Sequence, residues 1–353
     1  KGWPYMEKRL ITFILFAFSF VLNAGAVNQV VTYPRPSSAG DVEPGELKSP
    51  RFEVTVNNKE IFTEKLLFRG TAVDYHFAGS EKFNYHCARF AFNGSVNVKV
   101  TVHGCLNNYR IRPRSDHIKS RRQDSVILFT LKEPKNLLIQ TGKSWLYLFA
   151  DPIEKNPPKP GDSNVINIMD YKIDNSGSSL NTFEIQKAII DVATGPNTGG
   201  ILYFPPGVYL TGSIRLYSGV ELYLSAGAVL QASPHPGDFP LPFGVKHGAP
   251  GRDYGYDYGL IKIHHANNVG IRGRGTVDAA GALNGRLKIV HIMNSKNVNI
   301  EDVVLRNGHG WQVPILHASH VNLKNVRVIS PLTSNTDGIN PDASTDVVLD
   351  NVV

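Results

Sequence analysis

The chain has 353 residues, of which 42% are hydrophobic and 19% are charged, and its formal net charge is +7. This length allows two domains, and the composition excludes a low-complexity or disordered protein. The charge is uneven, because residues 27–150 hold 18 Lys and Arg against 11 Asp and Glu whereas the residues after 150 are slightly acidic. The overall basic balance therefore does not by itself indicate a polyanionic partner.

A thirteen-residue apolar run over residues 10–22 follows Lys8 and Arg9 and precedes Ala24-Gly25-Ala26. The run is too short to span a bilayer, and its charged, apolar and small-residue regions are those of a secretory signal. In the alternative interpretation, a buried helix, the basic flank and the small-residue ending would be coincidences. We expect residues 1–26 to be a signal peptide that starts at Met6, and the mature protein to be secreted or periplasmic.

Short alternating runs, among them residues 52–56, 96–102 and 125–131, are separated by turn residues. With no amphipathic helix between them, they predict an antiparallel β-sandwich over residues 27–150. The runs on either side of Asn93-Gly94-Ser95 predict a hairpin. In that hairpin Cys87 lies about 13 Å of strand away from Cys105, beyond the reach of a disulfide, so we expect two free thiols.

Residues 110–122 carry much of the basic excess of this first half. A solvated loop is one interpretation and a ligand-binding patch is the other, although the interleaved aromatic residues of a nucleic-acid site are missing. Residues 151–161 then contain four prolines. Such a segment rarely joins a sheet, so it predicts a semi-rigid linker over residues 151–164.

Beyond the linker, residues 182–193 have apolar side chains at helical spacing, and Asn181 is placed to cap their N-terminus. Four later motifs share a Val at positions 269, 298, 321 and 347, in steps of 29, 23 and 26 residues. A fifth motif, at Val220, lies 49 residues before the first, or about two such steps. These steps predict a solenoid over residues 165–353, with the Val residues stacked on one inward face and the helix covering its N-terminal end.

Several segments of this second half carry a family resemblance: residues 199–209, Gly273-Arg-Gly-Thr-Val-Asp278, residues 297–307 and, most specifically, Asn335-Thr-Asp-Gly338. Together they resemble glycoside hydrolase family 28, the polygalacturonase-type enzymes. The resemblance implies a right-handed parallel β-helix after an N-terminal β-domain. It also implies an inverting hydrolase of α-linked galacturonan or a related pectic polysaccharide, with Asp337 catalytic and Asn335 and Trp311 binding substrate.

The sequence departs from the family in two places. The family's Asp-Asp, Gly-His-Gly and Arg-Ile-Lys motifs would follow about one coil later, but the sequence ends at Val353. We therefore expect a fragment whose general acid lies beyond that residue. Gly308-His309-Gly310 precedes Asp337, where the family has a small residue, Pro and an aromatic residue, so we interpret His309 as a chance match and Trp311 as the aromatic residue.

The chemistry of the 330–340 turn leads to the same residue without the family. A carboxylate on a polar turn between two apolar strands lies at a strand end, where catalytic groups of β-scaffolds are commonly found. Inverting hydrolysis needs a carboxylic acid and a carboxylate base roughly 6.5 to 9.5 Å apart. Asp337 can be the base, whereas Asp342, Asp346 and Asp350 have the spacing of turn and strand-end residues.

Two alternatives remain open at this point. One is another β-helix polysaccharide-degrading enzyme, either dextranase-like or a pectate-type lyase, and a lyase would need several carboxylates for calcium. The other is a non-catalytic glycan-binding solenoid, which would need a groove lined by aromatic residues such as Trp311 and those of residues 254–258. We expect a polysaccharide as the partner, no nucleic acid, no membrane, no cofactor or metal, and a monomer.

Overall fold

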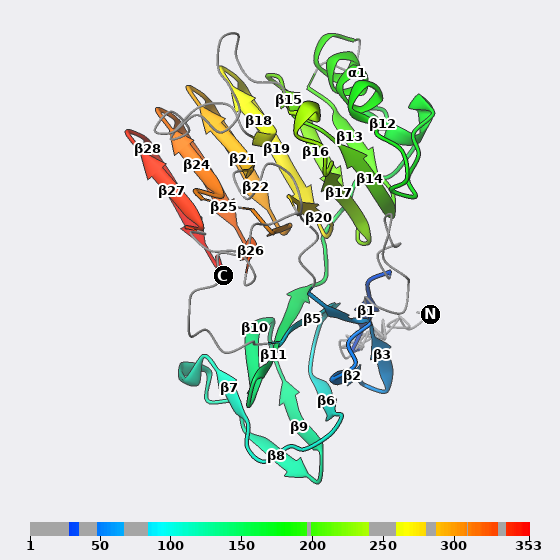
Figure 1. Ribbon diagram of the computed structural model, residues 1–353, viewed down its shortest axis with the longest axis vertical. Helices are drawn as coiled ribbons and strands as arrows, with labels where there is room; N and C mark the ends of the chain where they lie inside the picture. The colour runs from blue at the N-terminus through cyan, green and yellow to red at the C-terminus, as the bar shows by residue number, and fades with distance from the viewer. Residues whose placement is uncertain are drawn as a thin grey trace, which may run out of the picture.

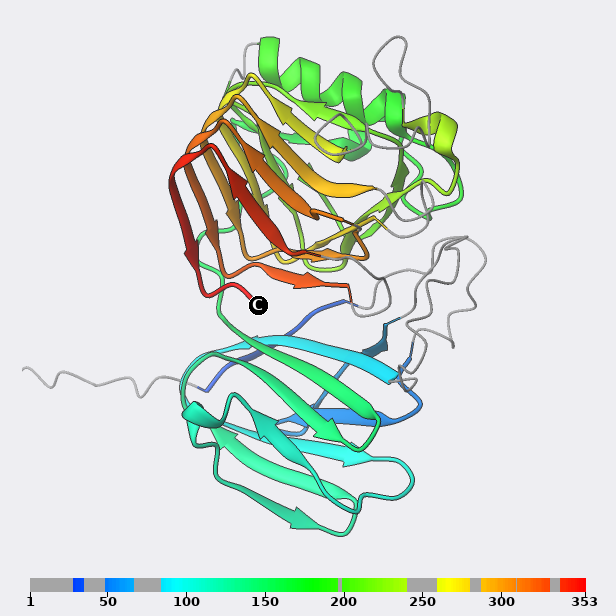
Figure 2. The ribbon, with the colours of Figure 1, turned by 60° about the vertical axis from the view of Figure 1, so that its left-hand side comes forward.

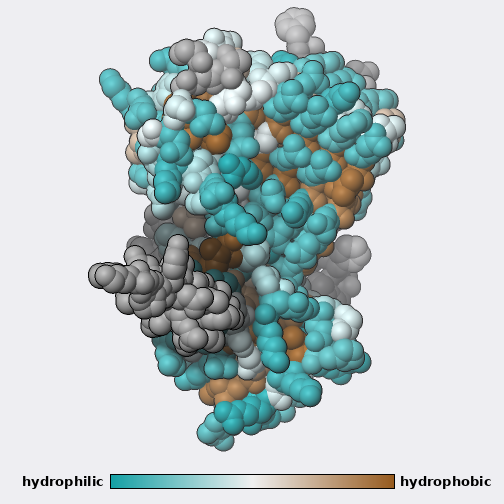
Figure 3. Space-filling model, turned by 180° about the vertical axis from the view of Figure 1, so that it is seen from behind, coloured by the Kyte–Doolittle hydropathy of each residue, from teal (hydrophilic) through white to brown (hydrophobic). Residues whose placement is uncertain are grey.

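The computed structural model describes residues 28–34, 48–66, 84–195, 199–239, 259–279, 287–308, 310–330 and 337–353. The predicted signal peptide, residues 1–26, lies outside them. The described chain forms a β-sandwich and a β-helix, drawn one below the other in Figure 1. Seen from behind, polar side chains cover most of the described surface, and hydrophobic side chains show between them (Figure 3). No helix in these ranges is long and apolar enough to cross a membrane.

The sandwich consists of two sheets that face each other across one hydrophobic core. The first sheet contains β1 (Val30–Thr32), β4 (Thr63–Lys65), β5 (Asn84–Phe92), β7 (Arg110–Arg112), β10 (Lys135–Thr141) and β11 (Ser144–Pro152). The second contains β2 (Phe52–Val56), β3 (Lys59–Ile61), β6 (Val96–Val102), β8 (Ser120–Gln123) and β9 (Val126–Leu131), with the short helix η1 (Arg114–Asp116) before β8. Every strand pair is antiparallel except β5 with β11, which is parallel.

The hairpin predicted across Asn93-Gly94-Ser95 is wrong. Phe92 of β5 pairs with Val30 in the first sheet, whereas Val96 of β6 pairs with Leu131 in the second. The segment therefore crosses from one sheet to the other, because the alternating side chains of both strands are buried in the core between the sheets. The prediction of two free thiols is confirmed, with Cys87 buried and Cys105 exposed.

The β-helix is built from coils that each add one strand to three parallel sheets. Sheet I contains β12 (Val165–Asn167), β13 (Ile201–Phe204), β16 (Glu221–Leu224), β19 (Asn267–Gly273), β22 (Lys296–Glu301), β25 (Ser319–Lys324) and β28 (Thr345–Asp350). Sheet II contains β14 (Gly207–Thr211), β17 (Ala228–Ala232), β20 (Thr276–Asp278), β23 (Val304–Arg306) and β26 (Arg327–Ile329). Sheet III contains β15 (Ile214–Leu216), β18 (Gly259–His264), β21 (Lys288–Met293), β24 (Val313–Leu316) and β27 (Ile339–Asp342). The predicted right-handed parallel β-helix is thereby confirmed.

The stacking of the shared Val residues is also confirmed. Val269 pairs with Val298, Val298 with Val321, and Val321 with Val347, and all four pack in the core. The reading of the 49-residue interval as two steps is wrong. Glu221 pairs directly with Gly270, so Val220 and Val269 lie on consecutive coils. That coil is long because an insertion separates β17 from β18.

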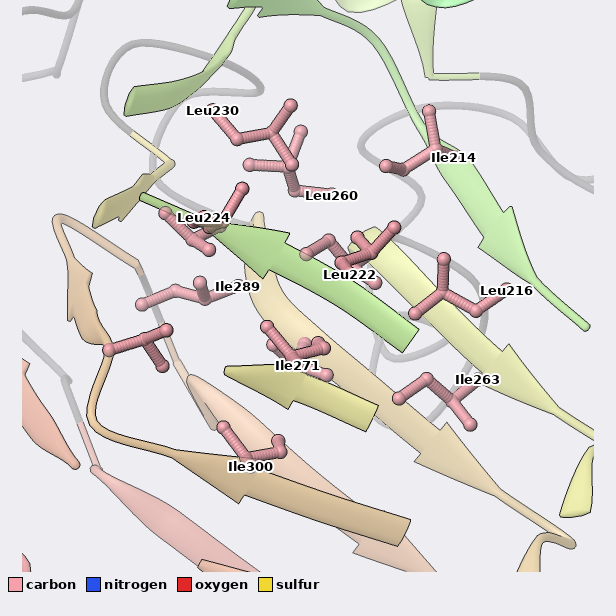
Figure 4. Packing of buried hydrophobic residues seen from close by; sticks show 14 of the residues in the cluster. Ile214, Leu216, Leu222, Leu224, Leu230, Leu260, Ile263, Ile271, Ile289 and Ile300 are labelled. Carbon is pink, nitrogen blue, oxygen red and sulfur yellow. The ribbon is translucent and has the colours of Figure 1, made fainter. Parts of the chain in front are cut away.

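The core of the β-helix is a set of aliphatic ladders. On sheet I, Leu222 pairs with Ile271, Ile271 with Ile300, and Ile300 with Leu323, and none of these side chains is exposed. Figure 4 shows such side chains pointing between the strands into one interior. Burial of each contributes about 1.5 to 3 kcal/mol relative to leaving it in water. Because the same contacts repeat in each coil, the strands of successive coils stay in register, and so do the loops between them.

The helix α1 (Thr182–Thr194) covers the N-terminal end of the coils, as predicted (Figure 2). Its apolar side is buried, and it contacts β13, β14, β15 and the short helix η2 (Ile168–Tyr171). The Asn181 side chain does not cap the helix. Its amide instead donates to the backbone oxygen of Asp174 and its Oδ1 accepts from the Asp174 backbone nitrogen, so it ties down the preceding loop.

The sandwich and the β-helix are joined through buried charged groups. Asp151, at the end of β11, is fully buried and accepts hydrogen bonds from Arg327 of β26 and, at 3.0 Å, from the hydroxyl of Tyr33. Arg274 lies 3.6 Å from the same carboxylate, and Arg89 lies 3.9 Å from it. Charge-assisted hydrogen bonds are directional, so this buried carboxylate and its three guanidinium neighbours constrain the geometry of the contact between the sandwich and the β-helix.

Candidate functional site

The candidate catalytic Asp337 lies directly before β27, in the connection from sheet II to sheet III. The Asp337 side chain is exposed, and its backbone oxygen accepts a 3.0 Å hydrogen bond from the backbone nitrogen of Gln312. The next bond, from Val313 to Gly338, is also 3.0 Å. The preceding coil therefore holds the backbone of Asp337. Asn335 and His309 both lie outside the described residues.

Gln312, which directly precedes β24 on the preceding coil, holds the backbone of Asp337 in place. Its side chain is buried, and its Oε1 accepts a hydrogen bond from the Ser330 hydroxyl at 2.5 Å. Its backbone oxygen accepts from the backbone nitrogen of Ile289 at 2.8 Å. Consecutive coils are thus cross-linked at the edge of sheet III where its strands begin, so the exposed carboxylate of Asp337 stands on a rigid base.

The register of sheet III aligns two further functional groups with Asp337. Val313 pairs with Ile339, so two residues earlier Trp311 lies level with Asp337. On the preceding coil, the backbone nitrogens of Ile289 and Val290 donate to the backbone oxygen of Gln312, so Lys288 lies at the same end of sheet III as Trp311. Neighbouring strands are about 4.8 Å apart, which sets Lys288 and Asp337 about 10 Å apart along the stack. We call these three residues the Lys288–Trp311–Asp337 row.

The three members of the row differ in their environment. Asp337 is exposed and Trp311 is half-buried, whereas only 7% of Lys288 is exposed. Burial lowers the pKa of the Lys288 ammonium, because desolvation disfavours its charged form. An anionic ligand group beside this ammonium would counteract that desolvation. The backbone pairing therefore places a carboxylate, an aromatic residue and a partly desolvated cation on successive coils at the same end of sheet III.

A buried histidine pair lies on the same sheet as the row. His264 Nε2 and His291 Nδ1 are 2.8 Å apart, and their rings meet edge to face. Burial lowers the pKa of His291 to about 3, with smaller contributions from His264, Lys288 and Lys262. His291 is therefore neutral at ordinary pH and adds no positive charge beside Lys288.

The sequence pattern pointed to Asp337 and Trp311 but not to Lys288 or the histidine pair. The 29-residue step contained a usable signal, because it stacks Lys262 on His291, and each of these mostly apolar strands carries a second such residue, His264 or Lys288. Burying polar side chains at successive positions of one solenoid face costs free energy unless they are hydrogen-bonded or serve a ligand. Among the described residues, no group of three His, Cys, Asp or Glu side chains is arranged to hold a metal ion.

Comparison with known proteins shows what this β-helix is similar to. Residues 165–312 match the family model of rhamnogalacturonase A/epimerase, pectate lyase-like. The chain is 32% identical over 194 residues to a probable polygalacturonase of Vitis vinifera, covering 50% of this chain and 40% of that protein. It is 41% identical over 76 residues to an exo-poly-alpha-D-galacturonosidase of Dickeya chrysanthemi, covering 22% of this chain and 12% of that protein. The second half of the chain is thus polygalacturonase-like.

Solved structures include a similar fold in the family 28 exopolygalacturonase of Yersinia enterocolitica. The two share 18% identity over 74% of this chain and 62% of that one, with a TM-score of 0.47. This chain spans less than half the length of the curated relatives that it matches.

Proposed function

We propose that the chain belongs to an inverting glycoside hydrolase that cleaves α-linked galacturonan or a related pectic polysaccharide outside the cell. In this proposal residues 27–150 are an accessory domain, residues 151–164 a linker whose first two residues end β11, and residues 165–353 carry the catalytic site. The observation that supports it most is the Lys288–Trp311–Asp337 row, together with the similarity of the surrounding coils to polygalacturonases.

Asp337 acts as the general base in this proposal. Its carboxylate accepts a proton from a water molecule, whose oxygen attacks the anomeric carbon from the face opposite the leaving sugar. The glycosidic oxygen takes a proton from an acid as the bond breaks, so the configuration at the anomeric carbon inverts. An exposed carboxylate on a rigid strand end can be ionised and within reach of water, as a base must be. Asn335, two residues away in the sequence, positions the sugar at the cleavage point.

Trp311 and Lys288 recognise the substrate in this proposal. A sugar ring packs its apolar C–H face against the indole of Trp311, and the carboxylate of galacturonate pairs with the Lys288 ammonium. A charge-assisted hydrogen bond to a partly desolvated cation is worth about 1.5 to 3 kcal/mol. This pairing favours an acidic polysaccharide over neutral dextran, the substrate of the runner-up interpretation. The polygalacturonase relatives favour the same choice.

We expect Lys288→Met to lower kcat/KM on polygalacturonate about tenfold to a hundredfold, because the substrate carboxylate loses its cation. Methionine keeps the apolar stem in place. The measurement is release of reducing ends from polygalacturonate, from its fully methyl-esterified form and from dextran, using the protein that carries this chain. Lys324→Met on β25, which is exposed and pairs with Glu301, is the matched control and should retain the unmodified rate.

Two results would contradict the proposal. Cleavage of dextran in place of polygalacturonate would keep the β-helix enzyme but change its substrate class. Equal rates on the acidic and the methyl-esterified polymer, unaffected by Lys288→Met, would show that the carboxylate is not recognised at the row.

A further inference from the structure

A basic hollow lies on the sandwich, away from the row. A cavity of about 960 Å³ opens over β6, β8, β9 and the short helix η1. These strands form the lower end of the molecule in Figure 1. The charged side chains that line the cavity are four cations and two carboxylates: Lys119, Arg121, Lys132, Lys135, Asp116 and Glu133. We call this cavity the sandwich groove.

The strand β8 presents its cations to the sandwich groove. Ser120 is partly buried, and its hydroxyl lies 2.9 Å from that of Tyr109, which packs against the sandwich core. Lys119, which directly precedes β8, and Arg121 are both exposed, whereas Ser120 between them is partly buried, so the two cations face away from that core. Arg121 pairs with Leu128 across the sheet, which fixes its position on the outer face.

The two carboxylates of the sandwich groove are already engaged. Lys135 Nζ lies 2.8 Å from Glu133 Oε1 and 3.6 Å from Asp116 Oδ1. Within the ranges that the structure describes, no carboxylate forms an ion pair with Lys119, Arg121 or Lys132. Four cations against two carboxylates leave the groove with a net charge of +2, and these three cations have no ion-pair partner among the described residues. The surrounding domain adds to it, because residues 27–150 carry seven more basic than acidic side chains.

We propose that the sandwich groove binds a stretch of carboxylated polysaccharide and anchors the polymer whose cleavage the row performs. This rests on the proposed function for the identity of the polymer. The unpaired cations lie on two neighbouring segments, Lys119 and Arg121 at the start of β8 and Lys132 directly after β9, which suits a chain with an acid on each sugar. Among the lining residues of the groove the one Phe, Tyr or Trp is Phe129, which is buried. A single-stranded nucleic acid would need open aromatic faces for its bases. Because both sites are in one chain, binding at the groove raises the local concentration of substrate at the row.

The test compares the double variant Lys119→Ala/Arg121→Ala with Lys48→Ala/Lys59→Ala, which removes the same charge outside the groove. We expect the first variant to raise the dissociation constant for a long polygalacturonate fragment about three- to thirtyfold, as the loss of two exposed ion pairs predicts. The control should bind as the unmodified protein does. Added salt should reduce the difference, since these charges are exposed. Turnover of trigalacturonate, too short to reach both sites, should be unchanged in both variants.

Equal affinity of the two variants for the long fragment would overturn the proposal. Single-stranded DNA of the same charge serves as the second probe. If it binds more tightly than the polysaccharide and loses affinity in the first variant, the groove is a nucleic-acid site and the proposal fails. If trigalacturonate is not cleaved while the first variant still has a reduced affinity for the long fragment, the proposed function fails and the groove assignment stands.

Discussion

Replacing Asp337 with Asn should lower kcat on polygalacturonate about 100- to 10,000-fold, the usual contribution of a general base. Asparagine keeps the size of the side chain and its hydrogen bonding but removes the charge that accepts the proton from water. KM should change little, because the backbone of Asp337 remains bound to Gln312 and the rest of the row is intact. The measurement is steady-state hydrolysis after circular dichroism has shown that folding is unchanged.

Asp342→Asn is the matched control for this prediction. Asp342 is an exposed carboxylate at the end of β27, the strand that follows Asp337, and its backbone oxygen accepts a hydrogen bond from the backbone nitrogen of His317. Its replacement makes the same change of charge on β27 but should leave kcat unaltered. A loss below about tenfold for Asp337→Asn would mean that the base lies elsewhere.

Replacing Asp151 with Ala should lower the free energy of unfolding by about 3 to 5 kcal/mol, the cost of leaving buried charges without their partner. The carboxylate is fully buried, whereas Arg327 and Arg274 are 1% and 4% exposed and would remain beside an empty position. Urea unfolding followed by tryptophan fluorescence measures the change.

Glu60→Ala provides the comparison at the surface. Glu60 pairs with Lys48 at 3.5 Å, and 72% of its side chain is exposed, so its loss should cost less than about 1 kcal/mol. The double variant Asp151→Ala/Arg327→Met should recover part of the stability, because it removes the unpaired guanidinium together with its partner. An Asp151→Ala protein as stable as Glu60→Ala would show that the buried cluster does not join the two bodies.

Much of the fold could be predicted because it repeats. The Val register from residue 269 to residue 347 predicted the coils, and the helical spacing around Ile185 predicted the helix that covers them. The hairpin across Asn93-Gly94-Ser95 could not be judged in the same way. Those turn residues fit a tight turn and a crossing between sheets equally well, and the sheet in which each strand pairs is decided by distant residues.

The candidate site shows the same limit. Asp337 and Trp311 were found because each lies in a recognisable local pattern. Lys288 was missed because it belongs to the row only through the register of three coils. The sequence repeat indicates that register approximately, and the strand pairs of the structure define it. The Asp151 cluster was missed for a related reason, since its arginines are 62 to 176 residues away.

The central claim, that the row performs inverting hydrolysis of galacturonan with Asp337 as the base, is tested most directly by the configuration of the first product. Proton NMR during the first minutes of polygalacturonate digestion distinguishes the two anomers before they equilibrate. The account predicts that the β-anomer appears first, and that its formation is lost in Asp337→Asn but kept in Asp342→Asn. Initial release of the α-anomer, or of an unsaturated sugar formed by elimination, would contradict it.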